Sequence, residues 1–210
     1  PGWTARSPGA AATPADFTLD GHLDKPAWQQ AEPARMEYVL RHLPAHPEIA
    51  TTVRSLWTTN FLYFSFDCPY TKLTTFTPAS KVERNGLWER DVVEVFLATD
   101  PRNPRRYTEF ELAPTNEKLD IALDAPKWDL TWNSGFETAV RVDETAGRWY
   151  AELRIPLKAL VTTPPTAGTQ WRLNLFRSDR EHEAFLAWST PLANSTHVPE
   201  RFGTLVFVTK

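Results

Sequence analysis

The sequence predicts an all-β protein: a two-sheet, antiparallel, jelly-roll-like β-sandwich with only short peripheral helical turns. Short apolar segments with an alternating pattern recur along the chain and are separated by turn-forming residues. The composition is rich in tryptophan and proline, with 9 and 18 residues in a chain of 210. Proline interrupts helices, and tryptophan supplies large apolar faces. Strands do not alternate with long helical segments, so a parallel sheet is disfavoured.

The clearest strand signal lies at residues 61–68, where the apolar side chains of Leu62, Phe64 and Phe66 fall on one face. Residues 52–58 precede it after only two intervening residues, so the two segments are predicted to pair as a hairpin. Residues 91–98 carry apolar side chains on both faces. That pattern is typical of a central strand that is covered on both sides.

Residues 105–112 and 118–123 also alternate, and they flank a turn-forming Ala-Pro-Thr-Asn segment. If the two segments pair, one face of the hairpin is expected to be polar. The residues expected on that face are Tyr107, Glu109, Glu111, Lys118 and Asp120. Further strands are predicted at residues 136–142, 149–155, 170–177, 184–188 and 203–208. Helical patterns are confined to residues 27–32 and 157–160.

Length and charge place the chain among ordinary globular domains. All-β sandwiches run to about 200–250 residues as single domains. The net charge is −3, and basic residues do not cluster with stacking aromatics, so no nucleic-acid partner is expected. Apolar stretches are too short to span a bilayer, which excludes membrane insertion by a helix. The single cysteine, Cys68, excludes an internal disulfide, and no zinc-ligand spacing is present. Protein partners are not predicted.

The first fifteen residues are small and rich in proline, and they predict a flexible lead. The chain starts at Pro1 without an initiator methionine. A mature secreted protein begins in this way after its signal peptide has been removed, although a cut made in a longer chain would look the same. The sequence therefore predicts a lead over residues 1–15, a sandwich domain over residues 16–210, and a secreted or periplasmic location.

Four local patterns follow one another along the chain. They are LDGHLDKPAW at residues 19–28, LYFSF at residues 62–66, RDVVEVFL at residues 90–97 and PERFGTL at residues 199–205. In order and spacing they resemble the family-9 carbohydrate-binding modules, over residues 17–208. The resemblance implies an antiparallel β-sandwich that binds sugars without cleaving them, within a polysaccharide-degrading system. It also implies binding at chain ends, as in characterised members, and a bound calcium ion that serves structure.

Two tryptophans are the candidate platforms for a sugar ring. A pyranose presents a face of C–H bonds edged by hydroxyls, so a binder combines a flat aromatic with charged or amide side chains. Trp88 lies in a polar, glycine-containing loop just before residues 91–98, where it has no obvious core to fill. Trp188 ends the strand predicted at residues 184–188, and the resemblance implies that a second tryptophan near the chain end completes an aromatic clamp. Packing at the sandwich edge is the alternative.

Charged and amide side chains are the candidates for binding sugar hydroxyls, because they match pairs of neighbouring hydroxyls. They are Arg90, Glu109, Asn174 and Arg177. For each, a structural salt bridge or a solvated position is the alternative. Trp128 and Trp132 flank a polar loop, where they either extend a groove or cover an edge. The tryptophans predicted to pack in the core are Trp28, Trp57, Trp149 and Trp171.

Two other functions are alternatives to sugar binding. Glu94, Glu109 and Glu111 could supply the carboxylate pair that a glycoside hydrolase requires, but surface carboxylates on strands often share a face. A haem-binding β-sandwich redox subunit would need axial ligands, and the single methionine, Met36, has no companion signal. The calcium ion implied by the resemblance would have carboxylates available in loops, without any EF-hand spacing. They are Asp16, Asp20, Asp24 and Asp100.

Overall fold

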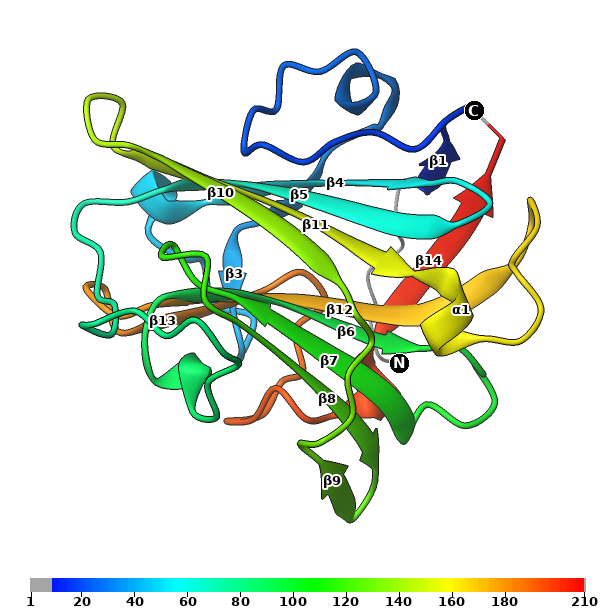
Figure 1. Ribbon diagram of the computed structural model, residues 1–210. Helices are drawn as coiled ribbons and strands as arrows, with labels where there is room; N and C mark the ends of the chain where they lie inside the picture. Colours follow the sequence, from blue (N-terminus) through cyan, green and yellow to red (C-terminus); the bar gives the residue numbers. More distant parts are fainter. Residues whose placement is uncertain (1–8, 210) are drawn as a thin grey trace.

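Fourteen strands, traced over the described residues 9–209 of this computed structural model, form two facing sheets (Figure 1). Sheet B, the upper layer in Figure 1, contains in spatial order β10 (Glu137–Asp143), β11 (Arg148–Pro156), β5 (Phe61–Pro69), β4 (Thr51–Trp57) and β1 (Ala10–Ala12), with β2 (Ala34–Met36) beside β4. Sheet A, the lower layer, contains β12 (Gln170–Asp179), β6 (Val92–Ala98), β7 (Arg106–Leu112), β8 (Lys118–Asp124) and β9 (Lys127–Asp129). The predicted sandwich is confirmed.

Short elements complete the two layers. Beside β12, sheet A also holds β13 (Ala184–Ala187), which pairs with β3 (Tyr38–Val39). The helical pieces are single turns: η1 (Trp28–Gln30), η2 (Pro47–Ile49), η3 (Leu87–Glu89), α1 (Leu157–Leu160) and η4 (Pro199–Arg201). Two of these turns, η1 and α1, lie in the segments where the sequence predicted helix.

The last strand, β14 (Gly203–Val208), joins the two sheets. It pairs antiparallel with β12 in sheet A and parallel with β1 in sheet B. The strand β1 is itself parallel to β4, so the parallel pairs of the described sandwich all involve β1. The predicted flexible lead is therefore wrong for residues 10–12, which have small alanine side chains that fit between two strands. Residues 1–8 lie outside the described part.

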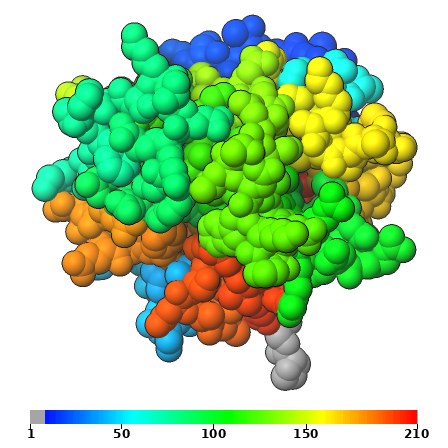
Figure 2. Space-filling view, turned by 60° about the horizontal axis from the view of Figure 1, so that its bottom comes forward, coloured from blue at the N-terminus to red at the C-terminus, as the bar shows by residue number. Residues whose placement is uncertain are grey.

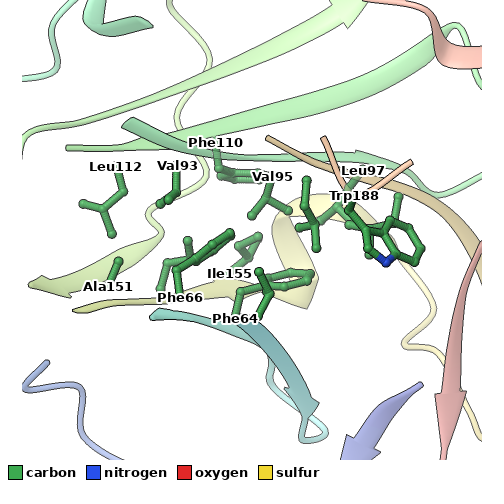
Figure 3. Close-up of a cluster of buried hydrophobic side chains, with 14 of the residues drawn as sticks. Phe64, Phe66, Val93, Val95, Leu97, Phe110, Leu112, Ala151, Ile155 and Trp188 are labelled. Carbon is green, nitrogen blue, oxygen red and sulfur yellow. The ribbon is translucent and has the colours of Figure 1, made fainter. Parts of the chain in front are cut away.

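The main core lies between the two sheets. Side chains from β5 and β11 in one layer meet side chains from β6 and β7 in the other, as Figure 3 shows. The labelled members include Phe64, Phe66, Val95, Phe110 and Ile155, all fully buried. Phe64 and Phe66 are among the residues that strand alternation assigned to one face. Trp149 and Trp171 belong to this core and Trp28 is buried beneath the N-terminal segment, as predicted, whereas Trp57 is only half-buried.

Sheet A buries its outer face as well. All seven residues of β6 are buried, as predicted for a strand covered on both sides. Val92, Phe96 and Phe176 form a second apolar cluster on the outer face, together with Phe202 and Leu87 from neighbouring loops. Leu40, Phe76 and Trp88 pack against this cluster from outside.

The β7–β8 hairpin forms as predicted, but the expected polar face was wrong. The register sets Glu111 opposite Leu119 and Glu109 opposite Ile121. Residues opposite each other in an antiparallel pair share a face, so the two glutamates lie among leucine and isoleucine side chains. Lys118 and Asp120 belong to the other face of the sheet; the side chain of Lys118 donates to the Phe136 carbonyl and Asp120 accepts from Ser134.

The N-terminal segment covers the outer face of sheet B and is held by Glu152 of β11. The Glu152 carboxylate, which is fully buried, accepts hydrogen bonds from the Trp28 indole at 2.7 Å and from the main-chain N–H groups of Asp20 and Gly21 at 2.9 and 2.7 Å. The Lys25 ammonium lies 2.7 Å from the same carboxylate and also pairs with Asp20. These contacts explain why the LDGHLDKPAW pattern occurs as a unit.

Gly21 within this segment has a positive φ of 80°. A Cβ atom there would lie 2.7 Å from the Cβ of Arg141. Glycine is therefore required where the segment passes over β10.

We expect Lys25→Met to lower the free energy of unfolding by about 3 kcal/mol, because it leaves the buried Glu152 carboxylate without its cation. Chemical denaturation measures the loss. The control is Lys158→Met, since Lys158 is exposed, and exposed substitutions usually stay within about 0.5 kcal/mol. Equal stabilities for the two variants would show that the N–H donors alone satisfy Glu152.

Candidate functional site

The outer face of sheet A carries three buried glutamates, which we call the carboxylate cluster: Glu94 of β6 and Glu109 and Glu111 of β7. Glu94 and Glu111 are direct cross-strand neighbours. Glu109 lies two residues from Glu111 on the same face, because strand side chains alternate. The exposed fractions are 2%, 3% and 0% in sequence order. Three acidic groups are thus held together in an apolar surrounding.

Burial and mutual repulsion raise the pKa of every member of the cluster. The pKa of Glu109 rises to about 7, mainly through burial. Burial and the neighbouring glutamates raise the pKa of Glu94 and of Glu111 well above the usual range, and the Arg180 guanidinium only partly offsets this for Glu94. A shared proton fits this arrangement, since a hydrogen bond between Glu109 and Glu111 favours the charged form of Glu109 and the neutral form of Glu111.

Donors are scarce around these carboxylates. Apart from the Glu109–Glu111 contact and the Trp88 main-chain N–H beside Glu111, no group within residues 9–209 donates to Glu109 Oε2 or to either carboxylate oxygen of Glu111, and all three atoms are buried. Buried polar atoms are nearly always hydrogen-bonded, so unpaired ones need an explanation. The cluster can therefore accept hydrogen bonds from an added group.

Trp88 lies beside the cluster in η3, the turn that leads into β6. The turn begins at Gly86, whose φ of 84° is left-handed. The Trp88 ring is half-buried and packs against the outer apolar cluster, and its main-chain N–H lowers the pKa of Glu111. Arg180 donates a hydrogen bond to the Trp88 carbonyl. The loop that contains Arg180 thus helps to hold the main chain of the turn.

Asp91 anchors these loops at the start of β6. It is 3% exposed, and its carboxylate accepts the main-chain N–H groups of Thr74 and Arg180, each at 2.8 Å. The sequence indicated Asp91 only as a polar neighbour of Trp88, and it did not indicate Arg180. Asp91 does lie in the RDVVEVFL pattern, which was the available signal. Figure 2 shows this side of the molecule, where the segments around residues 70–90 and 180–205 gather.

Arg90 lies on the same side as Trp88. Its guanidinium carbon is 4.5 Å from the centre of the Phe76 ring, and Nη1 donates to the Glu89 carbonyl at 3.0 Å. Phe76 packs on the outer apolar cluster. Of the residues singled out from the sequence, Trp88, Arg90 and Glu109 are therefore brought together on the outer face of sheet A.

Asn174 shares that face but is occupied by a structural contact. Its side-chain N–H group donates to the Ser189 carbonyl at 2.8 Å, and its Oδ1 accepts the Ser189 N–H at 3.0 Å. The residue is fully buried. Asn174 therefore ties β12 to the segment that follows β13.

Arg177 and Trp188 lie on the opposite face of sheet A. Arg177 is 1% exposed, and its guanidinium donates to the Ile49 carbonyl at 3.0 Å and pairs with Asp179 at 2.8 Å. Trp188 is 7% exposed and packs in the core between the sheets, as Figure 3 shows. The expected clamp of Trp88 and Trp188 is thus not formed, because strand alternation places Trp188 on the inner side, opposite Leu175 of β12.

The acidic residues considered for calcium are dispersed. Asp16 accepts from the Asn60 amide at 2.7 Å, Asp20 pairs with Lys25, and Asp100 pairs with Arg102 at 3.1 Å. Nowhere in residues 9–209 do three or more His, Cys, Asp or Glu side chains form a group that could hold a metal ion. These side chains do not fit a shared calcium site. Met36, considered for haem, is fully buried in the main core.

The part of the chain that the structure describes contains no helix with the length and apolar character needed to cross a membrane.

Comparison with known proteins gives two sequence relatives. An extracellular protein of Arthroderma benhamiae is 28% identical over 176 residues, which are 75% of this chain and 78% of that protein. Endo-1,4-beta-xylanase A of Thermotoga maritima is 26% identical over 193 residues, which are 89% of this chain but only 16% of the xylanase. The second match therefore concerns a small part of a much larger enzyme.

Solved structures share the fold over nearly the full length. A Bacteroides uniformis protein with a proposed role in carbohydrate binding has a TM-score of 0.76 at 16% identity, covering 96% of this chain and 99% of that one. A family 9 carbohydrate-binding module of Caldicellulosiruptor kristjanssonii, solved with cellotriose, has a TM-score of 0.68 at 15% identity, covering 96% and 94%. The family profile described as carbohydrate family 9 binding domain-like matches residues 19–210. The chain therefore belongs to this family of carbohydrate-binding domains.

Proposed function

We propose that the domain binds carbohydrate on the outer face of sheet A without cleaving it, with Trp88 as the stacking platform. The observation that carries the proposal is the set of buried carboxylate oxygens with few donors, on Glu109 and Glu111, beside a half-buried tryptophan. Family membership supports the same class of ligand, as does the fold shared with a module solved with cellotriose.

Sugar hydroxyls supply the donors that this site lacks. A hydroxyl donates one hydrogen bond and accepts others, and a bond to an ionised carboxylate is about twice as strong as a neutral one. A protonated glutamate in the cluster can donate back to the sugar. The guanidinium of Arg90 adds N–H donors in a planar arrangement. The C–H face of the ring packs on the Trp88 indole.

Binding involves a movement of the Trp88 side chain. The three glutamates are at most 3% exposed in the free chain, and Trp88 packs on the apolar cluster that surrounds them. A sugar hydroxyl can reach Glu109 only after the side chains that cover it move, and the half-buried Trp88 ring, whose main chain lies beside Glu111, is the one assigned this movement. The turn itself stays in place because Arg180 donates to the Trp88 carbonyl, while Asp91, just after the turn, is fastened to the main chain of Thr74 and Arg180.

Binding without hydrolysis fits the carboxylates better than catalysis does. Glycoside hydrolysis needs one protonated acid and one ionised partner on either side of the glycosidic bond. Here the three glutamates are neighbours on one face of two paired strands, so they would approach a ligand from the same side. The relative from Arthroderma benhamiae is an extracellular protein, which supports secretion of this domain. The partial match to a xylanase supports a place in polysaccharide degradation.

Trp88→Ala and Glu109→Gln should each weaken sugar binding at least about tenfold, equivalent to about 1.4 kcal/mol. Calorimetry with xylo-, cello-, manno- and galacto-oligosaccharides measures this, and at least one series should bind to the parent. Leu192→Ala is the control, since Leu192 is 54% exposed and outside the site.

Two results would contradict the proposal. One is parental affinity in both variants while their melting temperatures stay within about 2 °C of the parent. The other is turnover: chromatography after long incubation should show the oligosaccharides intact, and cleavage that disappears in Glu109→Gln would identify an enzyme.

The raised pKa of Glu109 predicts a dependence of stability on pH. Between the ordinary value of 4.5 and about 7 the folded state binds more protons than the unfolded state, so the stability contribution of Glu109 is present at low pH and is lost as pH rises through 7. Glu109→Gln removes this loss. The free energy of unfolding of the variant, relative to that of the parent, should therefore rise by about 2 kcal/mol from pH 5 to pH 8.

Denaturation at both pH values measures this gain. His197, whose pKa is lowered to about 4, titrates in parent and variant alike, so its effect cancels in the difference. Glu32→Gln, at an exposed position, serves as the control and should show no gain. A gain of the same size in both variants would contradict a raised pKa at Glu109.

A further inference from the structure

A groove of about 1080 Å³ opens at the end of the sandwich, where β7 begins and β8 ends. Its walls come from these strands, from β9 and from the segment that follows α1. Figure 2 shows the green surface of the β8–β9 region and the yellow surface near residue 160 side by side on this face. The carboxylate cluster and the Trp88 turn do not line the groove. The groove is therefore a separate feature.

Two tryptophans line this groove. Trp128 is 48% exposed and lies on β9, a short strand at the tip of a hairpin that projects from sheet A (Figure 1). Its ring rests against His197, with 4.6 Å between ring centres. Trp132 is half-buried and meets Phe110 edge to face at 6.0 Å. One aromatic face is thus fixed against the core while the other projects into solvent.

Free polar groups lie between and around these rings. The side chains of Arg106, Asp124 and Lys127 are exposed, and none makes a hydrogen bond or ion pair with another residue of the described chain. Thr162 and Thr163 add hydroxyls from the opposite wall. Donors and acceptors are therefore available along the groove.

The lining selects against other ligand classes. Two cationic side chains, Arg106 and Lys127, face three anionic ones, Asp100, Asp124 and Asp129. This near balance gives no attraction for a polyanion such as a nucleic acid. The many charged groups also disfavour a lipid chain. Aromatic faces alternating with free hydrogen-bonding groups match a glycan, which presents C–H faces edged by hydroxyls.

We propose that this groove is a second carbohydrate-binding site, which takes several consecutive units of one glycan chain. The inference rests on the proposed function only for the class of ligand. Pockets for single small ligands occupy about 300–1,000 Å³, and this groove, at about 1080 Å³, exceeds that range. Its two tryptophans provide separate platforms for units of the same chain.

The test is calorimetry on the whole domain with xylo- and cello-oligosaccharides of one to six units. Parental affinity should rise with chain length. Trp128→Ala and Arg106→Gln should each weaken hexasaccharide binding about tenfold and leave monosaccharide binding within about twofold. Leu130→Ala is the matched control, because Leu130 is a 40% exposed neighbour that does not line the groove. It should behave as the parent.

Pairing these variants with Trp88→Ala separates the two sites. Loss of all binding in Trp88→Ala, together with parental binding in Trp128→Ala and Arg106→Gln, would overturn the groove and leave the proposed function intact. Loss of hexasaccharide binding in the groove variants, together with parental binding in Trp88→Ala, would support the groove and overturn the Trp88 site. A parent that binds no oligosaccharide would overturn both.

Discussion

The alternation of side chains along β6, β7 and β12 sends one set into the core between the sheets and the other to the outer face of sheet A. Both sets are largely buried, so the outer face needs its own cover. Loops supply that cover, and Trp88 lies in one of them. Glutamates on such a face are removed from water, and this costs free energy unless hydrogen-bond donors accompany them. The candidate site follows from this constraint.

Buried carboxylates play two distinct parts in this molecule. Glu152 and Asp91 are surrounded by N–H donors and, for Glu152, by the Lys25 ammonium, so they fasten loops to the sheets. Burial raises the pKa of Asp91 as well as those of Glu109 and Glu111, but the oxygens of Glu109 and Glu111 lack a comparable set of donors. The physical difference is the supply of donors. Where the chain provides them, the carboxylate is structural; where it does not, the carboxylate is available to a ligand.

The sequence anticipated part of the candidate site. Trp88, Arg90 and Glu109 do gather on one face, since a polar loop leading into a buried strand is a local feature. Asn174, Arg177 and Trp188 instead make structural contacts, although the first two lie in a strand that was identified correctly and Trp188 directly follows another. Where both faces of a strand are buried, composition alone cannot distinguish the inner face from the outer one.

The sequence by itself determined the strands and the sandwich class, because a period of two and turn-forming residues act over a few positions. It also contained the LDGHLDKPAW and RDVVEVFL patterns that carry the family resemblance, and the structure shows the buried contacts that their residues make. Only the tertiary structure decided that Glu111 faces Leu119, that three alanines form β1, and that Trp188 lies in the core. These outcomes depend on pairing register and on contacts between distant segments, which no local pattern encodes.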